Sequence, residues 1–133
     1  MEQELLDYDV SKMKNFCFNG EFMARVVKVI DGDTIKVLFK CFDQFVLNKI
    51  RFARINTPEK DSKNNVEKEN AYKATEFLDS LLKDKIITFK TDKQDSFGRM
   101  LAEVYLNDKN INDLMLNEKY AVKYVKHKVS KKM

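Results

Sequence analysis

Apolar and polar residues alternate in three stretches of the first half of the chain, and this pattern predicts three β-strands. The stretches span residues 22–30, 34–39 and 45–53. Asp31 and Gly32 separate the first two stretches, and Asp-Gly between two strand-like runs is a strong signal for a hairpin. In the third stretch Ile50 and Phe52 share one face with Val46, so Arg51 must point to the opposite face, away from the core.

A helix is predicted over residues 66–83, where apolar residues recur at helical spacing. The apolar stripe consists of Ala71, Ala74, Phe77, Leu78, Leu81 and Leu82. Asn64, with Glu67 three residues later, resembles a capping box at the start of this helix.

Two further strands are predicted at residues 86–91 and 100–106, and a short second helix at 111–117. The order is three strands, one helix, two strands and one helix. This order predicts an α+β fold, a five-stranded Greek-key β-barrel of the oligonucleotide- and oligosaccharide-binding (OB-fold) kind. An open sandwich is the structural alternative. We expect an N-terminal leader at 1–21, the barrel domain at 22–125 and a basic C-terminal tail at 126–133.

The composition is that of one globular domain. The chain has 133 residues, 44% hydrophobic and 35% charged, and no apolar run exceeds three residues. No membrane association is therefore expected. The first ten residues contain four acids and no base, the reverse of a signal-peptide start, so we expect an intracellular, cytoplasmic protein without a signal peptide.

The net charge of +4 comes from the C-terminal end of the chain. Residues 123–133 contain five lysines and no acid, whereas the rest carries 20 bases and 21 acids. Such a tail is either a solvated end that aids solubility or an electrostatic arm for a polyanion such as nucleic acid.

Histidine and cysteine chemistry is poorly supported. Cys17 and Cys41 form no C-x-x-C pair, and His127 is the only histidine, so four ligands for a structural zinc are missing. A single histidine in a lysine-rich tail is also a poor general base. Any catalysis must therefore use carboxylates, arginines or a metal held by oxygen.

Three polar clusters could carry such chemistry. They are Asp31-Gly32-Asp33-Thr34, the segment from Arg51 to Glu59, and Asp95-Ser96-Phe97-Gly98-Arg99. Each alone is explained as a turn or as a surface residue. Together they supply what phosphoryl transfer needs: oxygen ligands for a hard cation, a carboxylate for water and arginines for phosphate.

The three motifs IDGDT, RFARINTPE and DSFGR, in this order and spacing, resemble the staphylococcal (micrococcal, thermonuclease-type) nuclease family. The resemblance runs from about residue 22 to 125. It implies an endonuclease-type phosphodiester hydrolase that uses Ca²⁺, acts on DNA or RNA and leaves 3′-phosphate ends. We expect it to act as a monomer.

The resemblance implies a role for each motif residue in metal binding and catalysis. Asp33, Asn56 and the backbone carbonyl of Thr57 would hold the metal ion. Arg51 and Arg99 would bind the scissile phosphate, because the planar guanidinium of arginine donates two parallel hydrogen bonds and stays charged. Glu59 would be the general base for the attacking water.

Substrate contacts are implied for Phe97 and Tyr124, at positions where the family has aromatic residues near the nucleotide. The chain departs from the family at Asn56, where an aspartate is usual, so one negative charge at the metal site is missing. Phe97 lacks the hydroxyl of the tyrosine usual in the family's best-known member. An alternative is therefore a catalytically weak or inactive nucleic-acid-binding module on the same fold.

Overall fold

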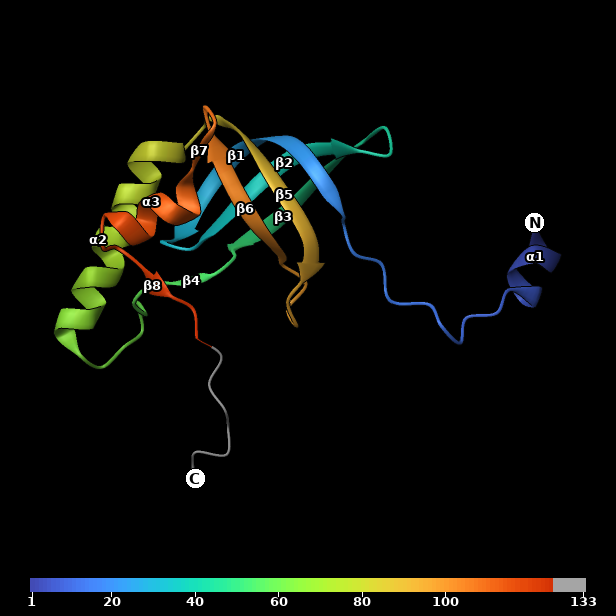
Figure 1. Cartoon of the computed structure of the whole chain (residues 1–133), viewed down its shortest axis with the longest axis horizontal. Helices are drawn as coiled ribbons and strands as arrows, with labels where there is room; N and C mark the ends of the chain where they lie inside the picture. Colours follow the sequence, from blue (N-terminus) through green and yellow to red (C-terminus); the bar gives the residue numbers. More distant parts are fainter. Residues whose placement is uncertain (126–133) are drawn as a thin grey trace, which may run out of the picture.

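The computed structural model describes residues 1–125 and shows a closed five-stranded β-barrel flanked by helices (Figure 1). The predicted basic tail, 126–133, lies outside the described residues. The barrel strands are β1 (Gly20–Asp31), β2 (Thr34–Cys41), β3 (Gln44–Phe52), β5 (Ile86–Gln94) and β6 (Met100–Leu106). The predicted fold class is confirmed, and each predicted strand is present with ends that differ by a few residues.

The barrel closes where the first and last barrel strands of the sheet meet. The sheet order is β3-β2-β1-β5-β6, and β3 also pairs in parallel with β6 over Ile50–Phe52. The fully buried Asn112 lies at this closure, where its amide nitrogen donates to the carbonyls of Ala53 and Ala102. Its oxygen accepts from the backbone of Val104 at 2.9 Å. A buried amide with all these bonds made ties the strands without an unpaired polar group.

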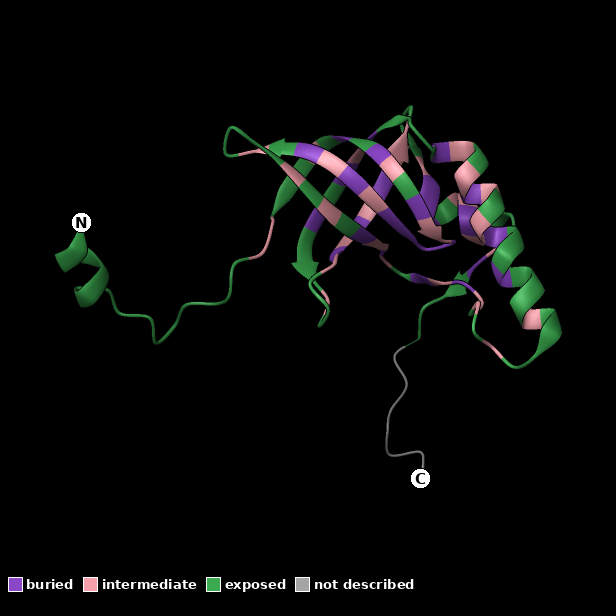
Figure 2. Cartoon of the chain, turned by 180° about the vertical axis from the view of Figure 1, so that it is seen from behind, coloured by how far each residue is buried: buried purple, intermediate pink, exposed green. Residues whose placement is uncertain are grey.

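The hydrophobic core lies inside the barrel and under the longer helix, as the buried positions in Figure 2 show. Ile35, Val37 and Phe39 of β2 point inward, as the alternation predicts. Ile50 and Phe52 of β3 are buried as well, and the intervening Arg51 lies on the opposite face.

Helix α2 (Asn65–Leu82) covers one side of the barrel and buries Ala71, Ala74, Leu78 and Leu82 of the predicted stripe. The Asn64 side chain caps it by accepting from the amides of Val66 and Glu67. The reciprocal half of the predicted capping box is wrong. The Glu67 carboxylate instead accepts from the Ser62 hydroxyl and the Glu59 amide, because the preceding loop folds back over the helix start.

The remaining elements are short and connect the end of the chain to the barrel. They are β4 (Ile55–Asn56), β7 (Lys109–Asn110), α3 (Ile111–Asn117) and β8 (Val122–Lys123). Strand β8 pairs with β4 in a separate two-stranded sheet, so the segment after α3 lies beside the loop that follows β3. The two-residue strands were not predicted, because two residues carry no periodic pattern.

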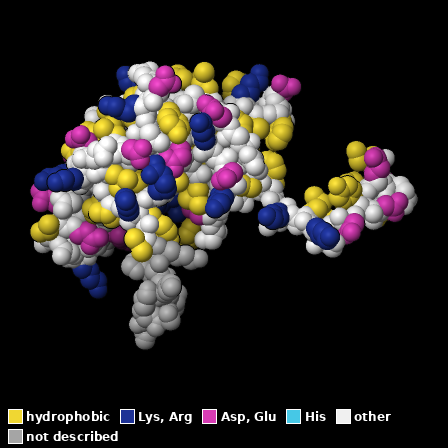
Figure 3. Space-filling model, in the orientation of Figure 1, with side chains coloured by type: hydrophobic (Ala, Val, Ile, Leu, Met, Phe, Trp, Pro, Cys, Tyr) yellow, Lys and Arg dark blue, Asp and Glu magenta, His cyan; other side chains and the backbone are white. Residues whose placement is uncertain are grey.

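The N-terminal segment carries a short helix, α1 (Glu2–Asp7), and extends away from the barrel (Figure 1). Its large apolar side chains are exposed, as the space-filling view shows (Figure 3). Phe16 and Phe18 are in edge contact with each other, and Phe18 also packs on Phe39 of the barrel.

Among residues 1–125, no helix combines the length and the apolar character needed to cross a membrane.

Gly32, in the turn between β1 and β2, is required by close packing. It lies outside the left-handed backbone region, but a Cβ there would be 2.8 Å from the Cβ of Ala74 and 2.9 Å from Cγ2 of Thr57. The hairpin turn therefore lies directly against α2 and against the loop after β4. This contact sets the position of the neighbouring Asp33.

We expect Gly32→Ala to lower the free energy of unfolding by about 1–3 kcal/mol, because the added methyl overpacks the contact with Ala74. Urea unfolding of the wild type and the variant measures this. Ala74→Gly combined with Gly32→Ala should show favourable coupling, since it removes one of the two clashing atoms. If the losses in stability of the two single variants simply add in the double variant, the contact with Ala74 is not the reason that residue 32 is glycine.

Candidate functional site

Asp33 lies in the turn just before β2 and is held by its neighbours. It is only 8% exposed, its Oδ1 accepts from the Thr34 hydroxyl, and its Oδ2 accepts from the Thr57 amide at 3.1 Å. These bonds fix the carboxylate between the β1–β2 turn and the loop after β4. Each oxygen keeps lone-pair capacity for a further ligand.

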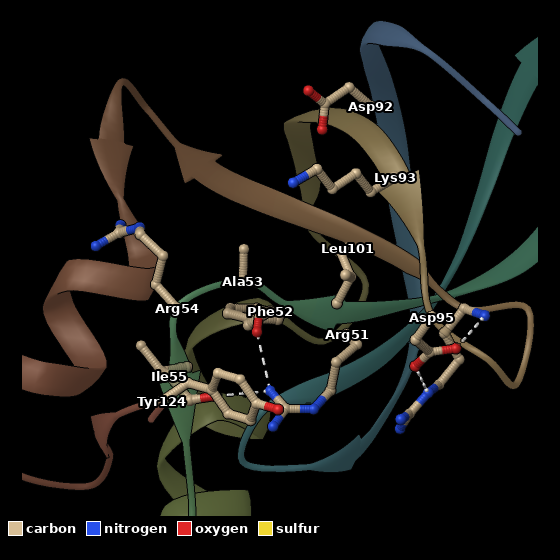
Figure 4. Close-up of a pocket in the computed structure, with 11 residues that line it drawn as sticks. Arg51, Phe52, Ala53, Arg54, Ile55, Asp92, Lys93, Asp95, Leu101 and Tyr124 are labelled. Atoms are coloured by element: carbon tan, nitrogen blue, oxygen red, sulfur yellow. Dashed lines mark hydrogen bonds and ion pairs between the residues drawn. The ribbon is translucent and has the colours of Figure 1, made fainter. Parts of the chain in front are cut away.

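Arg51 connects β3 to this loop. Its Nη1 donates to the carbonyls of Phe52 at 2.9 Å and Ile55 at 2.8 Å, as Figure 4 shows. Its Nη2 donates to Oδ1 of Asn56 and lies 3.4 Å from Oδ2 of Asp33. Arg51 lies on the face opposite to the core, as the strand alternation predicts, but the protein itself supplies partners for it there. Protein acceptors occupy both of its terminal nitrogens, because the chain turns back beside it after β3.

Asn56 and Thr57, the other two residues that the resemblance assigns to the metal, lie beside Arg51 and Asp33. Asp33 and Asn56 both contact Arg51, and the Thr57 amide donates to Asp33. The donor chemistry fits a hard cation such as Ca²⁺, because carboxylate, amide and carbonyl oxygens are its preferred ligands. A cation there would share the Asp33 carboxylate with Arg51.

Glu59 lies at the edge of a group of acids. Burial raises the pKa of Glu59, and the negative charges of Asp33, Asp61, Asp31 and Glu67 raise it further. No hydrogen-bond donor contacts its carboxylate within residues 1–125, although its own backbone amide donates to Glu67. The Glu59 carboxylate is therefore accessible on the same side as Asp33, in a region whose charge attracts cations.

Lys60 follows this acid group and holds the loop to β1. Its Nζ donates to the Ile30 carbonyl at 2.6 Å and lies 3.4 Å from Oδ1 of Asp31. The ammonium also lies 5.5 Å from the centre of the Tyr72 ring of α2. Lys60 thus ties the loop that carries Glu59 to the strand that precedes Asp33.

A surface pocket of about 490 Å³ lies beside Arg51 (Figure 4). It is lined by Arg51, Phe52, Ala53, Arg54, Ile55, Asp92, Lys93, Asp95, Arg99, Leu101 and Tyr124. Arg51 and Arg99, the two arginines that the resemblance assigns to phosphate, therefore line the same pocket. Asp33 and Glu59 do not line it, and Arg51 links the pocket to the carboxylate group.

Arg99 is positioned by Asp95 from the same turn. Its Nε donates to Oδ2 of Asp95 at 2.6 Å, while Oδ1 accepts from the backbone amides of Phe97 and Arg99. Burial would raise the pKa of Asp95, but these hydrogen bonds outweigh it and lower the pKa. The two terminal nitrogens of Arg99 make no hydrogen bond within the described part of the chain, so they can bind an anion.

Phe97 is 82% exposed at the tip of this turn, and the Arg99 guanidinium lies 5.5 Å from the centre of its ring. Phe97 does not line the pocket. The structure therefore places it at the outer side of Arg99, where the ring is open to a ligand.

Tyr124 reaches the pocket through the pairing of β4 with β8. Its backbone amide donates to the Arg54 carbonyl at 2.7 Å, and its side chain lines the same pocket as Arg51 (Figure 4). The Arg54 side chain turns away toward α3 and forms ion pairs with Glu103 at 2.6 Å and Asp113 at 2.9 Å. The hydrogen bond from Arg54 lowers the pKa of Glu103.

Sequence reasoning named Asp95 in a motif without giving it a role, and it missed Lys60. The sequence does contain a signal for the role of Asp95. An aspartate four residues before an arginine, with a glycine between them, favours a turn held by hydrogen bonds to the aspartate side chain. Lys60 had no such signal, since its partners lie 30 residues earlier and in α2. Its role depends on how the loop folds.

The sequence of the chain also matches a known protein family. Residues 49–133 match the family described as staphylococcal nuclease homologue. The chain therefore belongs to the staphylococcal nuclease homologue family, as the three sequence motifs suggested.

Several curated proteins are similar to the chain. An "Uncharacterized endonuclease" of Escherichia coli O157:H7 is 34% identical over 98 residues, covering 73% of this chain and 58% of that protein. "Endonuclease YncB" of Bacillus subtilis is 33% identical over 102 residues, covering 74% and 46%. "Uncharacterized protein MJ1439" of Methanocaldococcus jannaschii is 34% identical, covering 78% and 60%. The chain thus spans about half the length of these relatives.

The two arginines should respond differently to lysine. Arg51→Lys should lower the free energy of unfolding by about 2 kcal/mol or more, since one ammonium cannot make all of the hydrogen bonds that join β3 to the following loop. Arg99→Lys should cost less than about 1 kcal/mol, because Arg99 joins only residues of one partly exposed turn.

Urea unfolding of both variants measures the difference. Equal losses would show that the Arg51 network does not stabilise the fold as its hydrogen bonds indicate.

Proposed function

We propose that this chain is a Ca²⁺-dependent nuclease that hydrolyses phosphodiester bonds of DNA or RNA and leaves 3′-phosphate ends. The observation that carries the proposal is the position of Arg51. Its guanidinium contacts the side-chain oxygens of Asp33 and Asn56, and it also lines the pocket shared with Arg99. A phosphate between the two arginines would lie next to the carboxylates.

The protein groups would divide the reaction as follows. Arg99 offers two terminal nitrogens to the phosphate oxygens, and Arg51 contributes its remaining Nε donor. Glu59 takes a proton from the attacking water, a role helped by the raised pKa of its carboxyl group. Tyr124 and Phe97 offer aromatic surfaces to the nucleotide on either side of the arginines.

Asp33, Asn56 and the Thr57 carbonyl would hold the Ca²⁺ ion. When bound, the ion supplies positive charge that offsets the developing negative charge on the phosphate. The ion would also offset the negative charges that add to the effect of burial in raising the pKa of Glu59.

The names of two relatives, "Uncharacterized endonuclease" and "Endonuclease YncB", support the proposed activity. A catalytically weak nucleic-acid-binding module is the second candidate. Asn56 favours it, because its amide carries no charge and its oxygen already accepts from Arg51. The monomeric state and the cytoplasmic location stay predictions.

Single-stranded DNA should be cleaved in Ca²⁺ but not in EGTA. Glu59→Gln should lower kcat on the order of 100- to 10,000-fold with little change in substrate affinity, because the amide cannot accept the proton of water. Glu69→Gln, which removes an exposed carboxylate on α2, is the matched control and should be near wild type. Cleavage that survives chelation would contradict the metal, and near-normal turnover of Glu59→Gln would reassign the base.

Asn56→Asp should tighten Ca²⁺ binding to the free protein on the order of tenfold, because ligand charge is a main determinant of Ca²⁺ affinity. Calorimetry with and without a non-hydrolysed nucleotide measures this. The gain should shrink when the nucleotide supplies its own negative phosphate.

Asn117→Asp, which adds the same charge at the exposed end of α3, is the control and should leave Ca²⁺ affinity unchanged. Equal affinities of the wild type and Asn56→Asp would remove Asn56 from the ligand set. If the wild type does not cleave nucleic acid and the Asn56→Asp variant does, the natural chain is better interpreted as a nucleic-acid-binding module.

A further inference from the structure

Three lysines lie side by side on the outer face of the barrel, next to the proposed phosphate site. Lys28 of β1 pairs with Lys36 of β2, and Lys36 pairs with Lys49 of β3. We call this cross-strand group the basic row. Its members alternate with buried residues along their strands, so their side chains point away from the core.

The basic row is electrostatically unfavourable by itself. Directly paired residues on neighbouring strands have Cβ atoms about 5 Å apart, and like charges at that distance destabilise a sheet. None of the ion pairs within residues 1–125 involves Lys28, Lys36 or Lys49. A polyanion laid across the row would relieve this repulsion.

The basic row lies next to Arg51 of the proposed phosphate site. Lys49 precedes Arg51 by two residues on β3, so their side chains leave the same face about 7 Å apart. Arg51 pairs with Thr34 across the strands, and Lys36 follows Thr34 by two residues on β2. Arg51 therefore lines the pocket and also lies at one end of the basic row.

Apolar side chains border the row on the side away from Arg51. Leu47 and Phe45 of β3 are 54% and 74% exposed, and the Lys40 ammonium lies 5.8 Å from the centre of the Phe45 ring. An exposed ring beside lysines suits unpaired bases, which stack on aromatic faces while phosphates bind the cations. A single strand uses both features, whereas a duplex hides its bases.

We propose that the outer face of β1, β2 and β3 binds the flanking single strand of the substrate, with its phosphates on Lys28, Lys36 and Lys49 and its bases toward Leu47 and Phe45. This inference rests on the proposed function, because it names the path of the strand beyond the cleavage site. It also makes strand length a determinant of affinity.

The test compares binding of a fluorescent thymidine 12-mer, in EGTA so that no cleavage occurs, over a range of KCl concentrations. The variant is Lys36→Gln with Lys49→Gln. Each lost phosphate contact lowers the slope of log affinity against log salt by about 0.7, so the pair should lower it by about 1.4. That corresponds to about a 25-fold loss at 0.1 M salt if binding is equal at 1 M.

The matched control is Lys68→Gln with Lys73→Gln, which removes the same charge from the exposed side of α2 and should keep the wild-type slope. Binding of a thymidine dinucleotide should be alike in all three proteins, since its single phosphate would lie at the arginines and leave none for the row. The melting temperature of the Lys36 and Lys49 variant should equal or exceed that of the wild type, because a repulsive pair is removed. A lower melting temperature would mark the lysines as structural.

An unchanged slope, an equal loss in the control, or an equal loss for the dinucleotide would overturn the proposal. Poly-glutamate that binds as tightly as the 12-mer would also overturn it, by marking a site for acidic protein. Cleavage of the 12-mer in Ca²⁺ is scored separately. A reduced slope without any cleavage keeps the basic row and refutes the nuclease, and cleavage with an unchanged slope does the reverse.

Discussion

The guanidinium of Arg51 is the interaction on which the geometry of the site depends. It binds the carbonyls of Phe52 and Ile55 and the side chain of Asn56, and it lies within ion-pair distance of Asp33. A partly buried cation is stable only where acceptors replace its water, and the turn after β3 supplies them. The same side chain thereby positions the loop and the acids and forms one wall of the pocket.

This arrangement separates two electrostatic regions. Asp31, Asp33 and Glu59 form an acidic region next to Arg51, where burial and then the repulsion between the acids raise the pKa of Glu59. In the pocket, Arg99 is held by Asp95 through Nε, and its terminal nitrogens make no hydrogen bond within residues 1–125. A metal ion and a phosphate have opposite charges and need opposite surroundings. The fold brings both surroundings within reach of one side chain.

The scaffold explains why these groups stay in place. Barrel closure between β3 and β6 fixes the strand that carries Arg51, and the buried Asn112 satisfies the backbone at that closure. The contact of Gly32 with Ala74 fixes the turn that carries Asp33. Pairing of β4 with β8 brings Tyr124 to the pocket. Groups held by separate constraints of this kind are preorganised for an ionic ligand.

The sequence by itself determined the barrel strands, the long helix and the family, because alternation, helical spacing and three ordered motifs are local signals. It also determined that Arg51 leaves the core face, since strand side chains must alternate. Only the tertiary structure decided that Arg51 is bound by protein acceptors, that Lys60 ties its loop to β1, and that Gly32 is needed for packing. It also decided that Lys28, Lys36 and Lys49 lie in one row. Those facts depend on register and on contacts between distant segments, and no local pattern of residues encodes them.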